Sequence, residues 1–289
     1  MAFGVFLAVL LFPASAWAWG PGAHLSFSLE ILDSLSSFAP LLRDLLRAFP
    51  YDFLYGNISA DIIVGRRYAE YKHHCHNWTV GLQVLDRAGN RAQRAFAYGY
   101  LGHLAADTIA HNYFVPYQML AAFPNRVLRH NYWEMRFDSL VAGRVWETVK
   151  RMNGYIDKGD DVLLEKTLKR VVFSFKTNRR IFSSILLIQR MRRWRGMIRA
   201  HSSASKWKLT QEDFRKYSRR SCEAMSSVLR ESSHSRYFRL DPTGWGALST
   251  ARTLSSVLRA LARRNRVSSS LLSEILRDVE PDLSVRPQA

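Results

Sequence analysis

Three side chains spaced four residues apart give the strongest chemical signal in this chain. His103, Asp107 and His111 lie in the segment GHLAADTIAH. A step of four residues turns an α-helix by only about 40° beyond a full turn, so the three side chains share one face. The flanking segments FAYGYL and NYFVPY are apolar and aromatic, which predicts a buried helix. Burying two imidazoles with a carboxylate is costly unless a cation such as zinc satisfies them.

Further groups of potential metal ligands lie between positions 19 and 134. They are the pair His130 and Glu134, the run His73–His76 with Asp61 upstream, and the pair Trp19 and His24. Each group alone also fits a hydrogen-bonded helix pair or a surface turn. Their presence together in one stretch of chain predicts a multinuclear zinc site.

The first 18 residues have the character of a secretory signal peptide. They carry no charge, residues 3–12 form an apolar run, and Ala16 and Ala18 fit the small-residue rule of a cleavage site. We therefore expect an exported protein, periplasmic or secreted, with an uncleaved anchor as the alternative. Cleavage after Ala18 frees the α-amine of Trp19, which can chelate a metal together with its own carbonyl oxygen. His24 is then a natural second ligand.

Charge is distributed unevenly along the chain. Residues 1–150 hold 13 Lys and Arg against 11 Asp and Glu, whereas residues 151–289 hold 29 against 13. A strongly basic half attracts anionic partners, such as lipid head groups, lipopolysaccharide or nucleic acid. The two cysteines, Cys75 and Cys222, are too few for a disulfide scaffold, and the sequence leaves open whether they pair.

Hydrophobic periodicity predicts an all-α fold with a single domain over residues 19–280. Its ligand-bearing part is 19–134, its basic helical part is 151–280, and 281–289 form a frayed tail. Helices are expected over 25–46, 91–117, 125–153, 160–176, 179–200, 210–230 and 253–264. Loops are expected at 56–65, 157–161 and 240–246. Alternating runs of β-branched residues are scarce, which argues against a sheet.

In their order along the chain, the ligand motifs resemble those of the zinc-dependent phospholipase C family and its relatives, the fungal zinc-dependent single-strand nucleases. Those proteins begin with Trp after processing, as Trp19 would here, and a His follows. The short spacing to His24 resembles the nuclease branch. The segment GNISAD, ending in Asp61, resembles the GxxxPD of clostridial phospholipases, with Ala60 in place of proline.

The later motifs match the same family. His76-Asn77-Trp78 resembles the H-x-W of the phospholipase branch, and His103, Asp107 and His111 match a His-x-x-x-Asp motif followed by a further His. The final pair, His130 and Glu134, has the phospholipase form, since nucleases carry Asp at the second position.

The resemblance implies three zinc ions in one cleft of a helical domain. The first would be held by Asp61, His76, His103 and Asp107, with His74 as an alternative ligand. The second would be held by His111, His130 and Glu134. The third would be held by the Trp19 amine and carbonyl, His24, and Asp107 as a bridge. In the same comparison, Asp61 also orients or deprotonates the attacking water.

Three functions fit this reading. The first is a phospholipase C that cleaves glycerophospholipids, with a phospholipid or anionic membrane surface as partner; residues 181–199 then form either an interfacial helix or a core-packed helix with a basic outer face. The second is a single-strand nuclease, in which Trp194, Trp207 and Tyr217 could stack bases. The third is a non-catalytic zinc-binding periplasmic protein. No protein partner is predicted.

Overall fold

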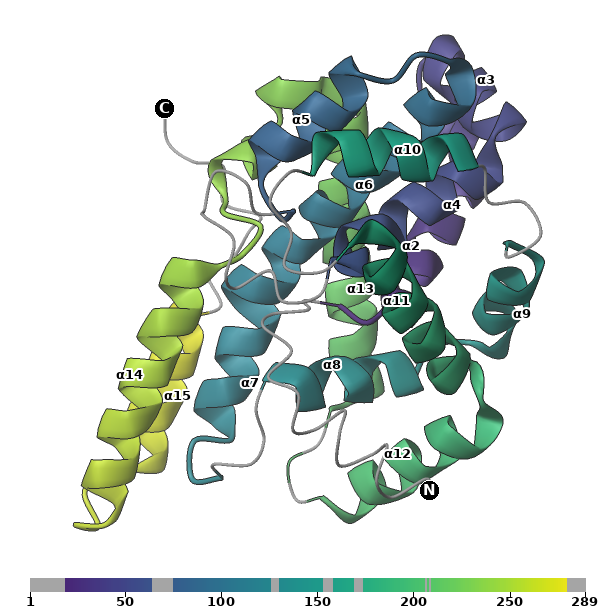
Figure 1. Ribbon diagram of the computed structural model, residues 1–289. Helices are drawn as coiled ribbons and strands as arrows, with labels where there is room; N and C mark the ends of the chain where they lie inside the picture. The colour runs from purple at the N-terminus through teal and green to yellow at the C-terminus, as the bar shows by residue number, and fades with distance from the viewer. Residues whose placement is uncertain are drawn as a thin grey trace.

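The computed structural model describes residues 19–63, 75–125, 130–152, 158–168, 174–205, 207 and 209–279. Helices make up all the regular secondary structure in these ranges, and no strand occurs within them, which confirms the all-α prediction (Figure 1). None of the helices described there combines the length and apolar character that a bilayer crossing needs.

Helices follow one another along the described residues. In chain order the α-helices are α2 (Pro21–Asp33), α3 (Pro40–Ala48), α4 (Pro50–Ser59), α5 (Trp78–Asp86), α6 (Arg91–Ile109), α7 (Val115–Ala121), α8 (His130–Ser139), α9 (Gly143–Met152), α10 (Lys158–Thr167), α11 (Phe175–Arg190), α12 (Arg192–Ala204), α13 (Gln211–Glu231), α14 (Trp245–Ala262) and α15 (Ser269–Val279). Shorter turns include the 3-10 turn η2 (Ala60–Ile62) and the π-helical turn η5 (Ala110–Phe114).

Helix starts follow recognisable sequence signals. Proline occupies the first turn of α2, α3 and α4, where its missing N–H is not needed. Asn77 and Asn90 cap α5 and α6 by accepting hydrogen bonds from backbone N–H groups of the first turn. Thr210 and Asp213 form a reciprocal capping box at the start of α13. This last start agrees with the helix predicted over 210–230.

Several predicted boundaries were wrong. The loop predicted at 56–65 is largely helical, because α4 runs to Ser59 and η2 continues it. The loop predicted at 157–161 contains the start of α10 at Lys158, and the helices predicted over 25–46 and 125–153 are each divided in two. The residue before Pro40 is extended, as proline requires of its predecessor, which separates α2 from α3. The helix predicted over 179–200 is likewise divided, at Met191, and helices α4, α5 and α15 were not predicted.

Helix α6 runs through the middle of the molecule, with α4, α5 and α13 packed around it (Figure 1). The α4–α6 crossing is close because both helices present glycine there. A Cβ atom on Gly56 would overlap the carbonyl of Phe96, and one on Gly99 would overlap the carbonyl of Phe53. This explains why Gly56 lies in a helix although its residue type suggested a loop. The close contact fixes α4, and with it Asp61, against the helix that carries His103 and Asp107.

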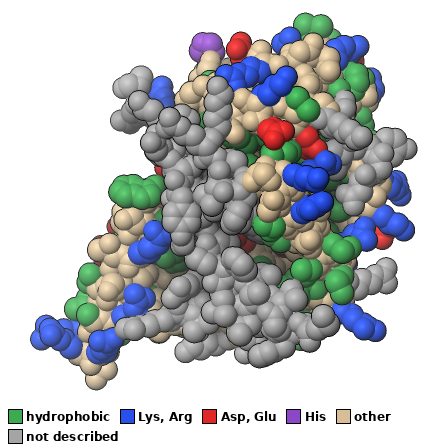
Figure 2. Space-filling model, viewed as in Figure 1, with side chains coloured by type: hydrophobic (Ala, Val, Ile, Leu, Met, Phe, Trp, Pro, Cys, Tyr) green, Lys and Arg blue, Asp and Glu red, His purple; other side chains and the backbone are tan. Residues whose placement is uncertain are grey.

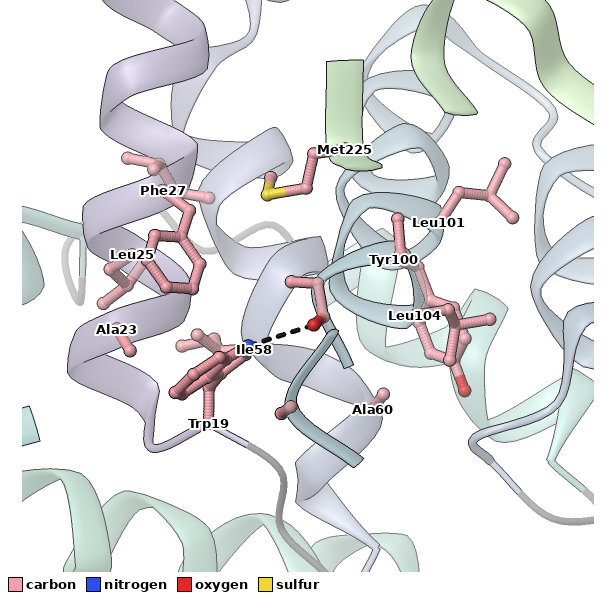
Figure 3. Close-up of a cluster of buried hydrophobic side chains, with 14 of the residues drawn as sticks. Trp19, Ala23, Leu25, Phe27, Ile58, Ala60, Tyr100, Leu101, Leu104 and Met225 are labelled. Carbon is pink, nitrogen blue, oxygen red and sulfur yellow. Dashed lines mark hydrogen bonds between the residues drawn. The ribbon is translucent and has the colours of Figure 1, made fainter. Parts of the chain in front are cut away.

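Trp19 is fully buried at the base of this core, below α2 (Figure 3). Its ring stacks on Phe114 at 4.8 Å and lies 4.2 Å from Phe137, measured between centroids. Its indole nitrogen donates a hydrogen bond of 3.0 Å to the carbonyl of Ala106, drawn as a dashed line in Figure 3. The first described residue is therefore attached to the turn of α6 that carries Asp107.

Helices α14 and α15 form a hairpin that packs beside α7 (Figure 1). A small buried cluster holds the hairpin to this part of the chain; it joins Ala251 and Leu258 of α14 to Leu120 of α7 and Phe123 just after it. Elsewhere the buried side chains of the described residues form one large core that extends from Trp19 to Leu248. The hairpin thus packs mainly through this small cluster, and it reaches the large core through Leu248.

Candidate metal centre

Asp107 lies at the centre of a buried group of imidazoles. Its Oδ2 is 3.1 Å from Nε2 of His76 and 3.2 Å from Nε2 of His103, and its Oδ1 is 3.1 Å from Nε2 of His24. These residues come from α2, the segment before α5, and α6. All are essentially inaccessible to solvent. One carboxylate therefore bridges three histidines from separate parts of the chain.

Asp61 completes the group. Its Oδ1 lies 3.3 Å from Nε2 of His76. Within the described residues, two sets of ligand atoms approach one another closely enough to hold a metal ion: His24, Asp61 and His103, and His76, His103 and Asp107. Five of the predicted ligands thus converge, and His103 belongs to both sets.

Outer hydrogen bonds orient two of these rings. The carbonyl of Asn57 lies 2.7 Å from Nδ1 of His103 and can only accept, so Nδ1 carries the proton and Nε2 presents its lone pair to the cluster. His76 is positioned through its neighbour, because the hydroxyl of Tyr100 donates a 2.5 Å hydrogen bond to the carbonyl of Cys75. Both Cys75 and Cys222 are buried free thiols, so they form no disulfide.

The electrostatics favour a neutral His24 beside an ionised Asp107. Burial lowers the pKa of His24, and nearby His103 lowers it further. Burial alone would raise the pKa of Asp107, but His103, His24 and His76 outweigh it and hold that pKa well below its usual value. Neutral histidine and ionised aspartate are the protonation states in which these residues bind metals.

The residues fit a divalent cation. Nδ1 of the buried His24 has no hydrogen-bond partner among the described residues, and Nε2 of His76 lies only 2.9 Å from Nε2 of His103. Two imidazole nitrogens at that distance repel unless a proton or a cation lies between them. Imidazole and carboxylate are ordinary zinc ligands. The chemistry of this donor set is that of a zinc site.

The other predicted ligands do not join the two convergent sets. His111 and Glu134 are buried. Nδ1 of His111 donates a 2.5 Å hydrogen bond to the carbonyl of Pro242, which leaves Nε2 as the lone-pair nitrogen. His130 begins α8, but its side chain lies outside the described part of the structure, as does His74 altogether. Because the π-helical turn η5 begins at Ala110, His111 lies outside the α-helix that carries His103 and Asp107, and the four-residue spacing of that helix does not extend to it.

Asp138 of α8 was missed by the sequence analysis. Its buried carboxylate accepts hydrogen bonds from the backbone N–H groups of Gly22 at 3.0 Å and Ala23 at 2.8 Å. It thereby caps α2 immediately before His24, and a Cβ atom on Gly20 would overlap this carboxylate. Burial raises the pKa of Asp138 to about 7, against the lowering effect of the two backbone donors. The signal was present, since Asp138 continues the four-residue spacing of His130 and Glu134.

An all-α fold with buried histidines gathered around a shared aspartate defines a class of helical metalloprotein. Residues 23–185 match the family described as zinc-dependent phospholipase C. The match covers more than half of the 289 residues, so the chain belongs to that family. No curated protein and no solved structure shows significant similarity to it. The family confirms the resemblance drawn from the motifs and supports zinc dependence and a phospholipase-type hydrolytic function.

Proposed function

We propose that this protein is an exported phospholipase C that hydrolyses glycerophospholipids to diacylglycerol and a phosphorylated head group. The observation that carries the proposal is the buried carboxylate of Asp107, shared by three buried histidines and adjacent to Asp61. Family membership supports phosphodiester hydrolysis as the reaction.

Zinc, when bound, supplies water that is acidic near neutral pH and neutralises charge on the phosphate. We assign the remaining work to the chain itself. Asp61, 3.3 Å from His76, orients the attacking water and accepts its proton. Asn57 and Tyr100 hold His103 and His76 in place through backbone carbonyls.

Three zinc positions are part of the proposal. The first uses Asp61, His76, His103 and Asp107; the second uses His111, His130 and Glu134; the third uses Trp19, His24 and Asp107. The first has the strongest support, because its four side chains lie in contact. For the second, support is limited to the burial of His111 and Glu134.

The third position depends on export and on cleavage after Ala18, which frees the Trp19 amine. The indole of Trp19 is bonded to the carbonyl next to Asp107, and Asp138 fixes the turn between Trp19 and His24. Both contacts support Trp19 as a ligand. An N-terminal extension before Trp19 should therefore lower zinc content and activity together, and intact mass identifies the mature N-terminus.

Lipid is a better substrate class than nucleic acid. Of the three aromatic residues considered for base stacking, Tyr217 is buried and packs edge-on against Phe114, at 5.0 Å between centroids. Trp194 and Trp207 are half-buried. The basic second half of the chain and the short Trp19–His24 spacing remain the arguments for a nuclease.

One experiment separates the alternatives. Purified mature protein is incubated with phosphatidylcholine vesicles or single-stranded DNA, with and without a chelator, and its zinc content is measured. Chelator-sensitive release of diacylglycerol supports the proposal, and turnover of DNA alone replaces it with a nuclease. Bound zinc without either activity indicates a non-catalytic zinc protein.

A substitution tests the role of Asp61. Asp61→Asn removes the carboxylate that would accept the proton but keeps the shape of the side chain. Turnover should fall by about a hundredfold or more, the scale of a general base, while the melting temperature stays near that of the wild type. Turnover like that of the wild type in a variant that retains its zinc would reject the assignment.

A further inference from the structure

Helices α11 and α12 form a continuous basic segment. Residues 175–204 contain eight Lys and Arg and no Asp or Glu. Figure 2 shows Lys and Arg side chains next to hydrophobic ones over the region that α11 occupies in Figure 1. A segment of one charge sign, without acidic neighbours in sequence, creates a positive field that attracts anionic surfaces.

The same segment exposes large apolar side chains. Leu187, Met191 and Met197 are 55%, 50% and 45% exposed, and they are three of the seven large hydrophobic residues so exposed in the described part of the chain. On α11, the exposed residues Lys176, Arg180 and Leu187 are spaced by four and seven positions, and exposed Met191 follows directly after the helix ends at Arg190. They therefore lie along one face of the helix. That face is basic at its start and apolar at its end.

A recess lined by both apolar and basic side chains opens beside this face. It is a cavity of about 200 Å³ between α4, α9 and α11. Ile58, Met152, Phe182 and Leu187 line it, together with the guanidinium-bearing side chains of Arg179 and Arg190. Arg179 is paired with Asp161, whereas no carboxylate among the described residues forms an ion pair with Arg190. Aliphatic walls with a nearby cation suit a lipid chain and its acidic head group.

The segment also lies against the elements that carry the candidate metal ligands. Helix α11 contacts η2, which contains Asp61, and α12 contacts α8, which contains Glu134. Arg199 of α12 donates a 2.7 Å hydrogen bond to the carbonyl of Ser139 at the end of α8. A surface held by α11 and α12 would thus lie next to the site.

We propose that the exposed face of α11 and α12 is a docking surface for a bilayer that contains anionic phospholipids. Basic side chains contact the head groups, and Leu187, Met191 and Met197 enter the interface. The proposal rests on the lipid specificity proposed above. Lipid fits better than single-stranded nucleic acid, because the exposed apolar residues are aliphatic and offer no flat ring for base stacking.

The test compares paired variants of the full mature chain. Arg180→Gln with Arg193→Gln removes two exposed charges from the surface, and Met191→Ser with Met197→Ser removes its apolar contacts. Arg263→Gln with Arg264→Gln and Leu41→Ser are the matched controls, since these residues are exposed elsewhere. Cosedimentation is measured with phosphatidylcholine vesicles, with and without phosphatidylglycerol.

Each basic residue near an anionic surface strengthens binding by roughly fivefold. The double charge variant should therefore lose tenfold or more in affinity for vesicles containing phosphatidylglycerol, and the Met variant should lose affinity for both vesicle types. The controls should keep wild-type affinity. Equal binding by the docking variants and the controls would overturn the proposal, as would a single-stranded oligonucleotide that binds through the same residues while vesicles do not.

A second readout separates docking from catalysis. Hydrolysis is measured on vesicles and on a short-chain phosphatidylcholine in monomeric solution, and the ratio of the two rates is compared between variants. A ratio that falls only in the docking variants supports the surface. Vesicle binding that depends on the surface, without hydrolysis of either substrate, would reject phospholipase activity but keep the docking surface. Hydrolysis of both substrates with an unaltered ratio would reject the docking surface alone.

Discussion

The ligand-bearing part and the basic part of this chain use polar groups in opposite ways. In residues 19–134, charged and titratable side chains such as Asp61, His103 and Asp107 face inward and are almost fully buried. In α11, in α12 and at the end of α14, arginines such as Arg180, Arg193 and Arg263 face solvent. A buried polar cluster depends on fixed geometry, whereas exposed charges act through their summed field. A single substitution in the buried cluster should therefore have a large effect on zinc binding and turnover. Each substitution of an exposed charge in the basic part should have a small effect, and these effects should add up.

Helix α13 shows that this contrast does not mark a domain boundary. It lies in the basic part of the sequence, yet Tyr217, Ala224 and Met225 are buried in the main core. Its contacts with α6 are among the most extensive in the molecule. The fold of the ligand-bearing part therefore requires part of the basic half.

The largest effect is expected where one side chain serves several ligands. Asp107→Ala removes the carboxylate shared by His24, His76 and His103, leaving three buried imidazoles without their bridge. Loss of an outer partner of a metal ligand lowers metal affinity or activity by roughly 10–100-fold. Substitution of Asp107 itself should therefore lower turnover by more than about a hundredfold and leave much of the site without zinc. Zinc analysis and lipid hydrolysis measure both.

The control for this substitution is a buried carboxylate outside the cluster. Asp161 accepts a hydrogen bond from Tyr55 and pairs with Arg179. Asp161→Asn should lower stability without lowering zinc per folded chain. If Asp107→Ala kept its zinc and Asp161→Asn lost it, the cluster around Asp107 would not be the metal site.

A glycine substitution compares packing in the two parts. Gly99→Ala puts a methyl group against the carbonyl of Phe53 at the α4–α6 crossing, whereas Gly246→Ala on α14 meets nothing within 4 Å. The first should destabilise the fold by roughly 3 kcal/mol, the upper range for overpacking. The second should stabilise it by up to about 1 kcal/mol, since alanine favours a helix over glycine. Urea unfolding of both variants tests the contrast, and equal stabilities would contradict it.

The sequence predicted most of the fold and the centre of the site, for reasons that are local. Four-residue spacing placed His103 and Asp107 on one face of α6, and the reciprocal cap at Thr210 marked the start of α13. Both signals depend only on a few neighbouring residues. The order of motifs along the chain then indicated the family.

What the sequence did not predict depends on distant contacts. Gly56 suggested a loop, but the backbone of α6 passes too close for any other residue. The capping role of Asp138 joins positions 115 and 116 residues apart. Carbonyls such as those of Asn57 and Pro242 orient histidines without any signal in their residue types.

A pH experiment sharpens the role assigned to Asp138. Burial raises its folded pKa from 3.8 to about 7. The protonated form then stabilises the fold fully below about pH 4, and this contribution is lost as pH rises through about 7. Asp138→Asn lacks the titration, so the stability of the wild type relative to the variant should fall between these values, by at most about 1.4 kcal/mol per pH unit.

Urea unfolding is measured in the presence of a chelator, so that no cation offsets the nearby charges of Glu134 and Asp61. A stability difference that does not change between pH 4 and 7 would show that Asp138 is ionised throughout. The assigned direction of its pKa shift would then be wrong, although its two backbone hydrogen bonds would stand.

The smallest effect is expected at the end of α14. Arg263 and Arg264 are exposed and have no ion pair in the described part of the structure, and the hairpin that carries them packs mainly through the small cluster it shares with α7. Removing both charges by Arg263→Gln with Arg264→Gln should change stability by less than about 0.5 kcal/mol and leave zinc content unaltered. Thermal unfolding and zinc analysis check this. A loss of zinc here would contradict the separation between an inward-facing metal centre and an outward-facing basic surface, because no described contact connects these two arginines to the buried ligands.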